Sequence, residues 1–241
     1  MNPLRSVVAM LTLSVLAVGC AGTEESETTD VGPGATSVQV VGGAGDVTVD
    51  GDASPEGAMV TVLRSDTGED AEVSIELGDD GVIRVSDDCG GDEECVVGYL
   101  VELDGPADVD IVTTGGDVLV RDTTGSVTVD SGGGEVALTA TDGTTEVTSG
   151  GGGILATQIV AAESVFESGG GDADVTLDDS VDSVSITTEG GGLTVQLPGG
   201  PYAIDADTGG GALDVLVDES ADSASTATLR SGGGDITVYR R

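Results

Sequence analysis

A serine or threonine followed by a run of glycines recurs along the second half of this 241-residue chain. This motif constrains the fold more than any other feature of the sequence. Self-similarity at a period of about 20 residues indicates a repeat architecture in which each repeat packs only on its neighbours. The hydroxyl residue of the motif is found at Thr114, Ser131, Ser149, Ser168, Thr188, Thr208 and Ser231.

Apolar residues keep a constant distance from the motif. One lies two positions before each hydroxyl residue, as Val112 does before Thr114, and a pair lies five and seven positions after it. In the first repeat, which has one glycine fewer, the pair is Val118 and Val120, at four and six positions. A spacing of two places side chains on one face of a strand. The glycines occupy the odd step between the two sets, where a bend must keep both sets inside.

Each repeat therefore predicts a strand, a glycine corner and a second strand, with successive repeats paired in parallel about 4.8 Å apart. We predict an all-β chain that forms a right-handed parallel β-solenoid (β-helix) over residues 107–241. Residues 36–106 are rich in strands but break the period, and we expect them to form an irregular β cap. The strand candidates in this cap region are 37–41, 46–49, 58–63, 71–77, 82–85 and 96–103.

The first 20 residues resemble a bacterial lipoprotein signal. A short segment containing Arg5 precedes a 12-residue, mostly apolar run that is too short to span a bilayer as a helix. The run ends in a small residue and Cys20, the arrangement of a lipobox, although Ala17 stands where leucine is usual. We predict a signal peptide over 1–19, lipidation of Cys20, a flexible tether over 20–35, and an extracytoplasmic protein anchored to the cell membrane. An ordinary secretory signal and an uncleaved anchor are the alternatives.

Cys89 and Cys95 are the two remaining cysteines. Because export places them in an oxidising compartment, we expect a disulfide between them. A metal site with two thiolates is the alternative, and it lacks further ligands because the chain has no histidine and its third cysteine, Cys20, is the predicted lipidation site.

Composition excludes several classes of function. The chain has 45 acidic residues against 7 basic ones, a net charge of −38, and it lacks histidine and tryptophan. Such a charge repels phosphates, which argues against a nucleic-acid partner. Without histidine there is no Ser-His or Cys-His nucleophile pair. We assign no catalytic, cofactor-binding or metal-binding residue, and expect only diffuse association of cations with the acidic surface.

The glycine corner followed by aspartate and alternating valine or isoleucine, as in residues 231–238, resembles the bacterial putative-adhesin family. The stretch 101–106 before the regular repeats is also similar to this family, and the likeness covers roughly 36–241. The resemblance implies a β-solenoid exposed on the envelope and carries over no catalytic residues.

These observations favour a lipid-anchored, noncatalytic protein of the cell envelope, an adhesin or an envelope-organising module whose ligand the sequence does not specify. The first alternative is a calcium-binding repeat protein, although the corners at 42–46, 169–172 and 232–235 all miss the Gly-Gly-x-Gly-x-Asp consensus. The second is a polysaccharide-acting β-helix enzyme that uses a carboxylate pair such as Asp178 and Asp179. The chain has too few aromatic residues to build the platforms usual in polysaccharide clefts.

Overall fold

A computed structural model describes residues 12–14, 25–53, 57–65, 71–90, 95–179 and 181–241, and these residues form two β-sheets and no helix. The 12-stranded sheet contains, in spatial order, β1 (Thr12–Ser14), β2 (Glu25–Gly32), β5 (Ala58–Arg64), β8 (Val97–Glu102), β4 (Val47–Asp50), β10 (Val118–Thr124), β12 (Val136–Asp142), β14 (Ile154–Val160), β16 (Ala173–Leu177), β18 (Leu193–Leu197), β22 (Ile236–Arg240) and β20 (Leu213–Leu216). The 10-stranded sheet contains β19 (Ala203–Asp207), β21 (Thr226–Ser231), β17 (Ser183–Thr188), β15 (Glu163–Ser168), β13 (Thr145–Ser149), β11 (Val127–Ser131), β9 (Asp108–Thr113), β3 (Ser37–Gly42), β7 (Val82–Asp88) and β6 (Glu72–Leu77).

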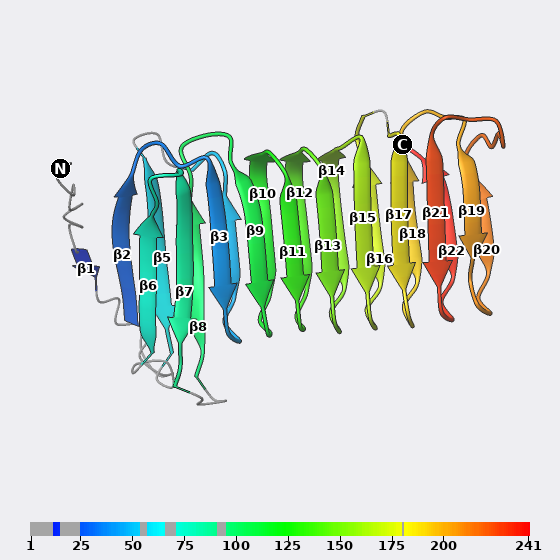
Figure 1. Ribbon diagram of the computed structural model, residues 1–241. Coiled ribbons are helices and arrows are strands. Elements are labelled where there is room, and N and C mark those ends of the chain that lie inside the picture. The colour runs from blue at the N-terminus through cyan, green and yellow to red at the C-terminus, as the bar shows by residue number, and fades with distance from the viewer. Residues whose placement is uncertain (1–11, 15–24, 54–56, 66–70, 91–94, 180) are drawn as a thin grey trace.

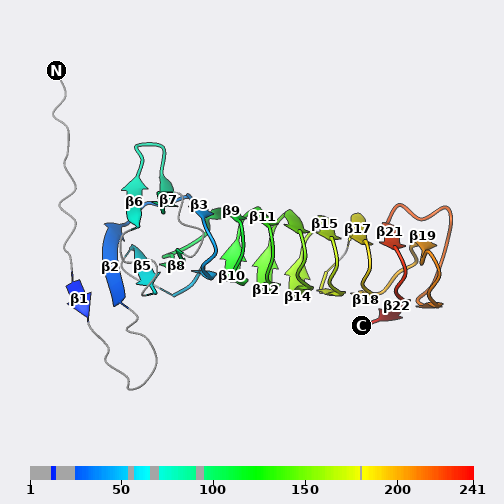
Figure 2. The same cartoon turned by 90° about the horizontal axis from the view of Figure 1, so that it is seen from below.

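Consecutive strands from β9 to β18 alternate between the two sheets, and each strand from β9 to β16 pairs in parallel with the strand two places later in the chain. We call one strand from each sheet, with the glycine corner that joins them, a rung. The rungs stack side by side, so that the two sheets face each other along the whole array (Figures 1 and 2). The prediction of an all-β chain is confirmed.

The core lies between the two sheets and consists of columns of aliphatic side chains. In the 12-stranded sheet, Val118, Val136 and Ile154 occupy equivalent positions on neighbouring strands, and each is at most 2% exposed. In the 10-stranded sheet, Val129 and Val147 pair in the same way and are buried. The glycine corner reverses the chain between the sheets, so both apolar sets of the repeat point into one core.

The first repeat has a different register from the one expected. Thr113, and not Thr114, pairs with Ser131, and Thr113 is 4% exposed. Ile111 then takes the apolar position two before the hydroxyl and is fully buried, whereas Val112 faces outward and is 40% exposed. Because two threonines are adjacent, the sequence permits both readings. With Thr113, the pair that follows stands at the usual five and seven positions.

The N-terminal region differs from the prediction in two ways. Strands β3 and β4 pair in parallel with β9 and β10, so they form the first rung of the regular stack. The other strands of the cap contain antiparallel pairs, namely β2 with β5, β5 with β8 and β6 with β7. The remaining difference concerns the expected tether, because residues 25–32 form strand β2. Backbone hydrogen bonds to β5 hold β2 in place. The acidic sequence of residues 25–32, which has few apolar side chains, does not predict this strand.

The order of the last two rungs is reversed relative to the sequence. Strands β21 and β22 lie between the rung of β17 and β18 and the rung of β19 and β20. The rung of β19 and β20 therefore ends both sheets, at the right-hand end in Figure 1. Within the described part of the chain, no helix is long and apolar enough to cross a membrane.

Candidate functional site

The hydroxyl residues of the repeat lie inside the glycine corners. Ser149 Oγ accepts a hydrogen bond from the backbone N–H of Gly152 and lies 3.1 Å from the Gly152 carbonyl oxygen. Ser168 Oγ lies 3.0 Å from the carbonyl oxygen of Gly171 in its own corner and 3.0 Å from that of Gly152 in the neighbouring corner. These hydroxyls are buried and bind backbone groups, so they connect rungs and present no hydroxyl array to solvent.

Stacked corners leave no room for a side chain at the third residue after the hydroxyl residue. A Cβ atom placed on Gly152 would lie 1.5 Å from the carbonyl oxygen of Gly134 in the preceding rung. Gly151, one residue earlier, has no atom within 4 Å of such a Cβ. Close approach of backbones therefore explains part of the glycine content without a ligand.

The aspartates that follow several corners have a structural role. Asp117 Oδ1 accepts the backbone N–H of Glu135 at 2.8 Å, and Asp172 Oδ1 accepts that of Gly192 at 2.8 Å. Asp235 Oδ1 does the same for Ala212 at 2.7 Å. Each carboxylate thus bonds the equivalent position of an adjacent rung. Across the described residues, no group of three or more acidic, histidine or cysteine side chains is arranged to hold a metal ion.

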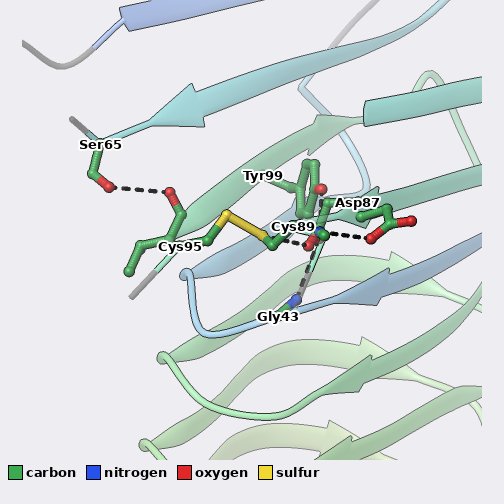
Figure 3. Close-up of a disulfide and its surroundings, with 9 residues drawn as sticks. Gly43, Ser65, Asp87, Cys89, Cys95 and Tyr99 are labelled. Atoms are coloured by element: carbon green, nitrogen blue, oxygen red, sulfur yellow. Dashed lines mark hydrogen bonds between the residues drawn. A yellow bond between two sulfur atoms is a disulfide. The ribbon is translucent and has the colours of Figure 1, made fainter. Parts of the chain in front are cut away.

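A disulfide joins Cys89 and Cys95, with the two Cα atoms 6.0 Å apart (Figure 3). It connects the end of β7 in the 10-stranded sheet to the segment before β8 in the 12-stranded sheet. Cys95 is 6% exposed. The bond therefore links the two sheets of the cap at one edge of the core.

The carboxylate of Asp87, beside the disulfide, organises polar contacts that the sequence did not point to. Tyr99 is 1% exposed and its hydroxyl donates to Asp87 Oδ1 at 2.8 Å, while the backbone N–H of Gly43 donates to the same oxygen at 3.3 Å (Figure 3). Burial, together with the hydrogen bond to Asp87, raises the pKa of Tyr99 far above its ordinary value. A Cβ on Gly42 would lie 3.3 Å from the Tyr99 ring, so glycine replaces the usual hydroxyl residue in this rung.

The two outward faces of the stack differ in charge. From β9 to β19, the two central outward rows of the 10-stranded sheet contain one basic residue, Arg230, and several acidic ones, Asp110, Asp130, Glu146, Glu167, Asp205 and Asp207. The matching rows of the 12-stranded sheet, from β10 to β20, contain two acidic residues, Asp174 and Asp214, beside Arg121. The other positions in those rows are uncharged, namely Leu119, Ala137, Thr139, Leu155, Thr157, Thr176, Thr194, Gln196, Leu216, Thr237 and Tyr239. We call this surface the low-charge face.

An open groove of about 550 Å³ lies at one edge of the low-charge face. Its lining includes Leu155, Asp174 and Thr194, as well as the corner aspartates Asp172 and Asp235. The carboxylate pair considered for catalysis lies elsewhere, and Asp178 forms an ion pair with Arg241. Cys20 lies outside the described residues.

Several solved structures are similar to this chain. A putative adhesin from Bacteroides fragilis is 13% identical and aligns over 91% of this chain and 100% of its own, with a TM-score of 0.56. A putative cell adhesion protein from Clostridium sporogenes is 15% identical over 92% and 100%, with a TM-score of 0.41. A putative lipid binding protein from Parabacteroides distasonis is 10% identical over 88% and 96%, with a TM-score of 0.46. No family model and no curated protein matches the sequence. The Bacteroides likeness shows a shared fold.

Proposed function

We propose that this chain is a lipid-anchored, noncatalytic β-solenoid of the cell envelope that acts as an adhesin or envelope-organising module through its low-charge face. The anchor is Cys20, at the end of the lipobox-like segment. In this proposal the rungs wind in a right-handed sense. No observation favours the calcium-binding alternative, because the described residues contain no group of three or more acidic, histidine or cysteine side chains placed to hold a metal ion.

The contrast between the two outward faces carries this proposal. A chain with a net charge of −38 repels anionic polymers over most of its surface. The low-charge face reduces that repulsion locally, and it combines flat rows of hydroxyls with exposed leucine, such as Leu155 at 40%. Such a face suits an extended, uncharged glycan of the envelope, which offers hydroxyl groups and apolar ring faces. The name of the Bacteroides neighbour, a putative adhesin, agrees with a role in surface contact.

Cosedimentation with particulate chitin, an insoluble and uncharged glycan, tests the face. The full-length chain is compared with Leu155→Asp on the low-charge face and with Val165→Asp on the acidic face. Val165 is 37% exposed, so the two substitutions add the same charge at similar exposure. We expect Leu155→Asp to reduce the bound fraction severalfold and Val165→Asp to leave it unchanged. Failure of the unmodified chain to cosediment, or equal losses in both variants, contradicts the proposed binding face.

Membrane fractionation of cells that express the full-length chain tests the anchor. With labelled palmitate, the wild-type chain is expected in the membrane fraction with label, and Cys20→Ser is expected without label. Cys89→Ser with Cys95→Ser is the control, because it removes the two cysteines of the disulfide but leaves the lipobox intact. An unlabelled wild-type chain in the medium would overturn the lipoprotein interpretation.

A further inference from the structure

The last rung of the stack has a core that is open on one side. Leu213 of β20 pairs with Ile236 of β22 and occupies the same column as Leu193 and Ile154. Those three residues are at most 2% exposed, whereas Leu213 is 50% exposed. Leu213 thus points toward the core but is covered by a neighbouring rung on one side only.

Both strands of this rung also end their sheets. β20 is the last strand of the 12-stranded sheet and β19 is the last strand of the 10-stranded sheet. Beyond β19 and β20 the described structure has no further strand, although just before β19 the N–H and C=O of Tyr202 already bond the segment 218–220, which covers that end of the edge. The remaining free edges are templates for pairing with another chain. Ile204 and Ala206 of β19 are half-buried, which extends the open core to the second sheet.

We propose that the rung of β19 and β20 is a self-association surface that pairs with the same rung of a second copy, end to end. A two-fold axis perpendicular to the stacking direction brings the two ends together and pairs both edges antiparallel at once. The paired ends bury Leu213 and form two continuous sheets. This inference does not depend on the proposed function of the low-charge face.

The geometry favours a second copy over other occupants. One extended peptide closes only one of the two edges and leaves the other half of the core open. The opposite end of the stack does not fit either, because its edge strands, β1 and β6, belong to antiparallel pairs. There the β6–β7 hairpin also diverges from β2 and β5 (Figure 2). The partner that fits the rung of β19 and β20 is therefore the same rung of a second copy.

Charge and area set the strength of this contact. Asp205, in the middle of β19, is already paired with Arg230 of the neighbouring rung, so the acidic charge nearest the edge is partly neutralised. Asp207 and Asp214 oppose association through like-charge repulsion, which salt screens. Strands of about five residues in sheets about 10 Å apart offer an end of roughly 350 Å² per copy, below the roughly 800 Å² of a standard interface. We therefore expect a weak dimer that forms at high salt.

Light scattering of the full-length chain in nonionic detergent, at low salt and in about 1 M NaCl, measures this association. We expect monomers at low salt and a concentration-dependent dimer at high salt. The double variant Leu213→Asp with Leu216→Asp is expected to weaken the dimer at least about tenfold, since it places charge in the contact. Val165→Asp is the control on the acidic face and should dimerise like the wild type.

Amide hydrogen exchange locates the contact and controls for folding. Protection of residues 203–207 and 213–216 should rise with protein concentration in the wild type and not in the double variant. Unchanged exchange elsewhere, together with an unchanged melting temperature, shows that the double variant is folded. A monomer at about 1 mM protein in high salt overturns the proposal. So does a dimer that persists in the double variant or is lost in Val165→Asp.

Discussion

The hydroxyl of Tyr99 donates a 2.8 Å hydrogen bond to the carboxylate of Asp87, and the two residues belong to different sheets. Asp87 also accepts the N–H of Gly43, in the first corner of the regular stack. This pair, beside the Cys89–Cys95 disulfide, therefore connects the antiparallel cap to the first rung. It does so from within the core, because Tyr99 is 1% exposed.

Replacing Tyr99 by Phe removes this connection and should lower the free energy of unfolding by about 2 kcal/mol, as for a hydrogen bond to a charged group. Because the pKa of Tyr99 is raised in the folded state, its contribution is present below about pH 10, the pKa of an unfolded tyrosine, and is lost at higher pH. Denaturant unfolding at pH 7 and pH 11 measures both effects. We expect a smaller decline at pH 11 in Tyr99→Phe than in the wild type, although Tyr202, whose pKa burial also raises, retains part of it. An equal decline would refute this account.

Thr141 offers a stabilising substitution. Its hydroxyl is buried and has no hydrogen-bond partner in the described part of the chain, and Ile159 occupies the same column position on β14. Thr141→Val keeps the shape and removes the unsatisfied hydroxyl, so we expect a gain of about 1 kcal/mol in thermal or denaturant unfolding. Thr145 is the matched control. It is equally buried, but its hydroxyl donates to the Gly143 carbonyl at 3.3 Å, and Thr145→Val should be destabilising. The reverse order of the two variants contradicts the argument.

The register of the columns can be tested with one charge in two places. Val147 is fully buried between Val129 and Phe166 on the neighbouring strands. Val147→Asp should cost several kcal/mol, because an unpaired charge enters an apolar core. Thr148 points the other way, between Asp130 and Glu167 on the neighbouring strands, and Thr148→Asp should cost only about 1 kcal/mol of like-charge repulsion in the same denaturant titration. Equal tolerance at both positions would show that the register is wrong.

The glycine corners can be tested with a single methyl group. A Cβ on Gly152 would overlap the Gly134 carbonyl oxygen, whereas a Cβ on Gly151 meets nothing within 4 Å. We expect Gly152→Ala to lower the melting temperature by several degrees, because two rungs must separate. Gly151→Ala should leave it within about a degree or two of the wild type. Similar melting temperatures for the two variants would argue against close stacking at this corner.

The net charge of −38 predicts a dependence of stability on salt. Self-repulsion destabilises the compact state, and the screening length falls from about 10 Å at 0.1 M salt to about 3 Å at 1 M. The melting temperature should rise over this range, with magnesium and calcium equally effective at matched ionic strength. Calorimetric titration is the control for specific sites. A saturable, calcium-selective isotherm contradicts diffuse association, and an unchanged melting temperature contradicts the repulsion argument.

The repeat could be read from the sequence because its chemistry is local. Within ten residues the repeat contains a buried strand position at Val129, the hydroxyl position at Ser131 and the glycines of the corner. The equivalent residues of the next repeat pair with these two residues at the same spacing. The error at Thr113 arose where two hydroxyl residues are adjacent, so that local spacing permits two registers. The spacing to Val118 and Val120 favours Thr113, and the pairing with Ser131 shows it.

The other features depend on contacts between distant parts of the chain. Strand β2 was assigned to the tether because its residues carry no apolar period, and its partner β5 is supplied by residues 58–64. The Tyr99–Asp87 pair joins two strands whose relative position depends on the cap topology. The two outward faces could have been compared from the sequence, because the apolar register also specifies the outward positions.

The insertion of β21 and β22 between two earlier rungs has a consequence for the order of assembly. A stack that grows one rung at a time, as the chain emerges, can proceed as far as β18. Strands β19 and β20 then have no completed neighbour until residues 226–240 are available. In a chain interrupted before Thr226, the edges of β17 and β18 therefore stay exposed, because their partners β21 and β22 are missing. The rung of β19 and β20 then lacks the strands with which it pairs. Completion of this end of the molecule is thus all or nothing, and proteolysis of such a chain would act on the whole segment 198–225 rather than on a single frayed strand.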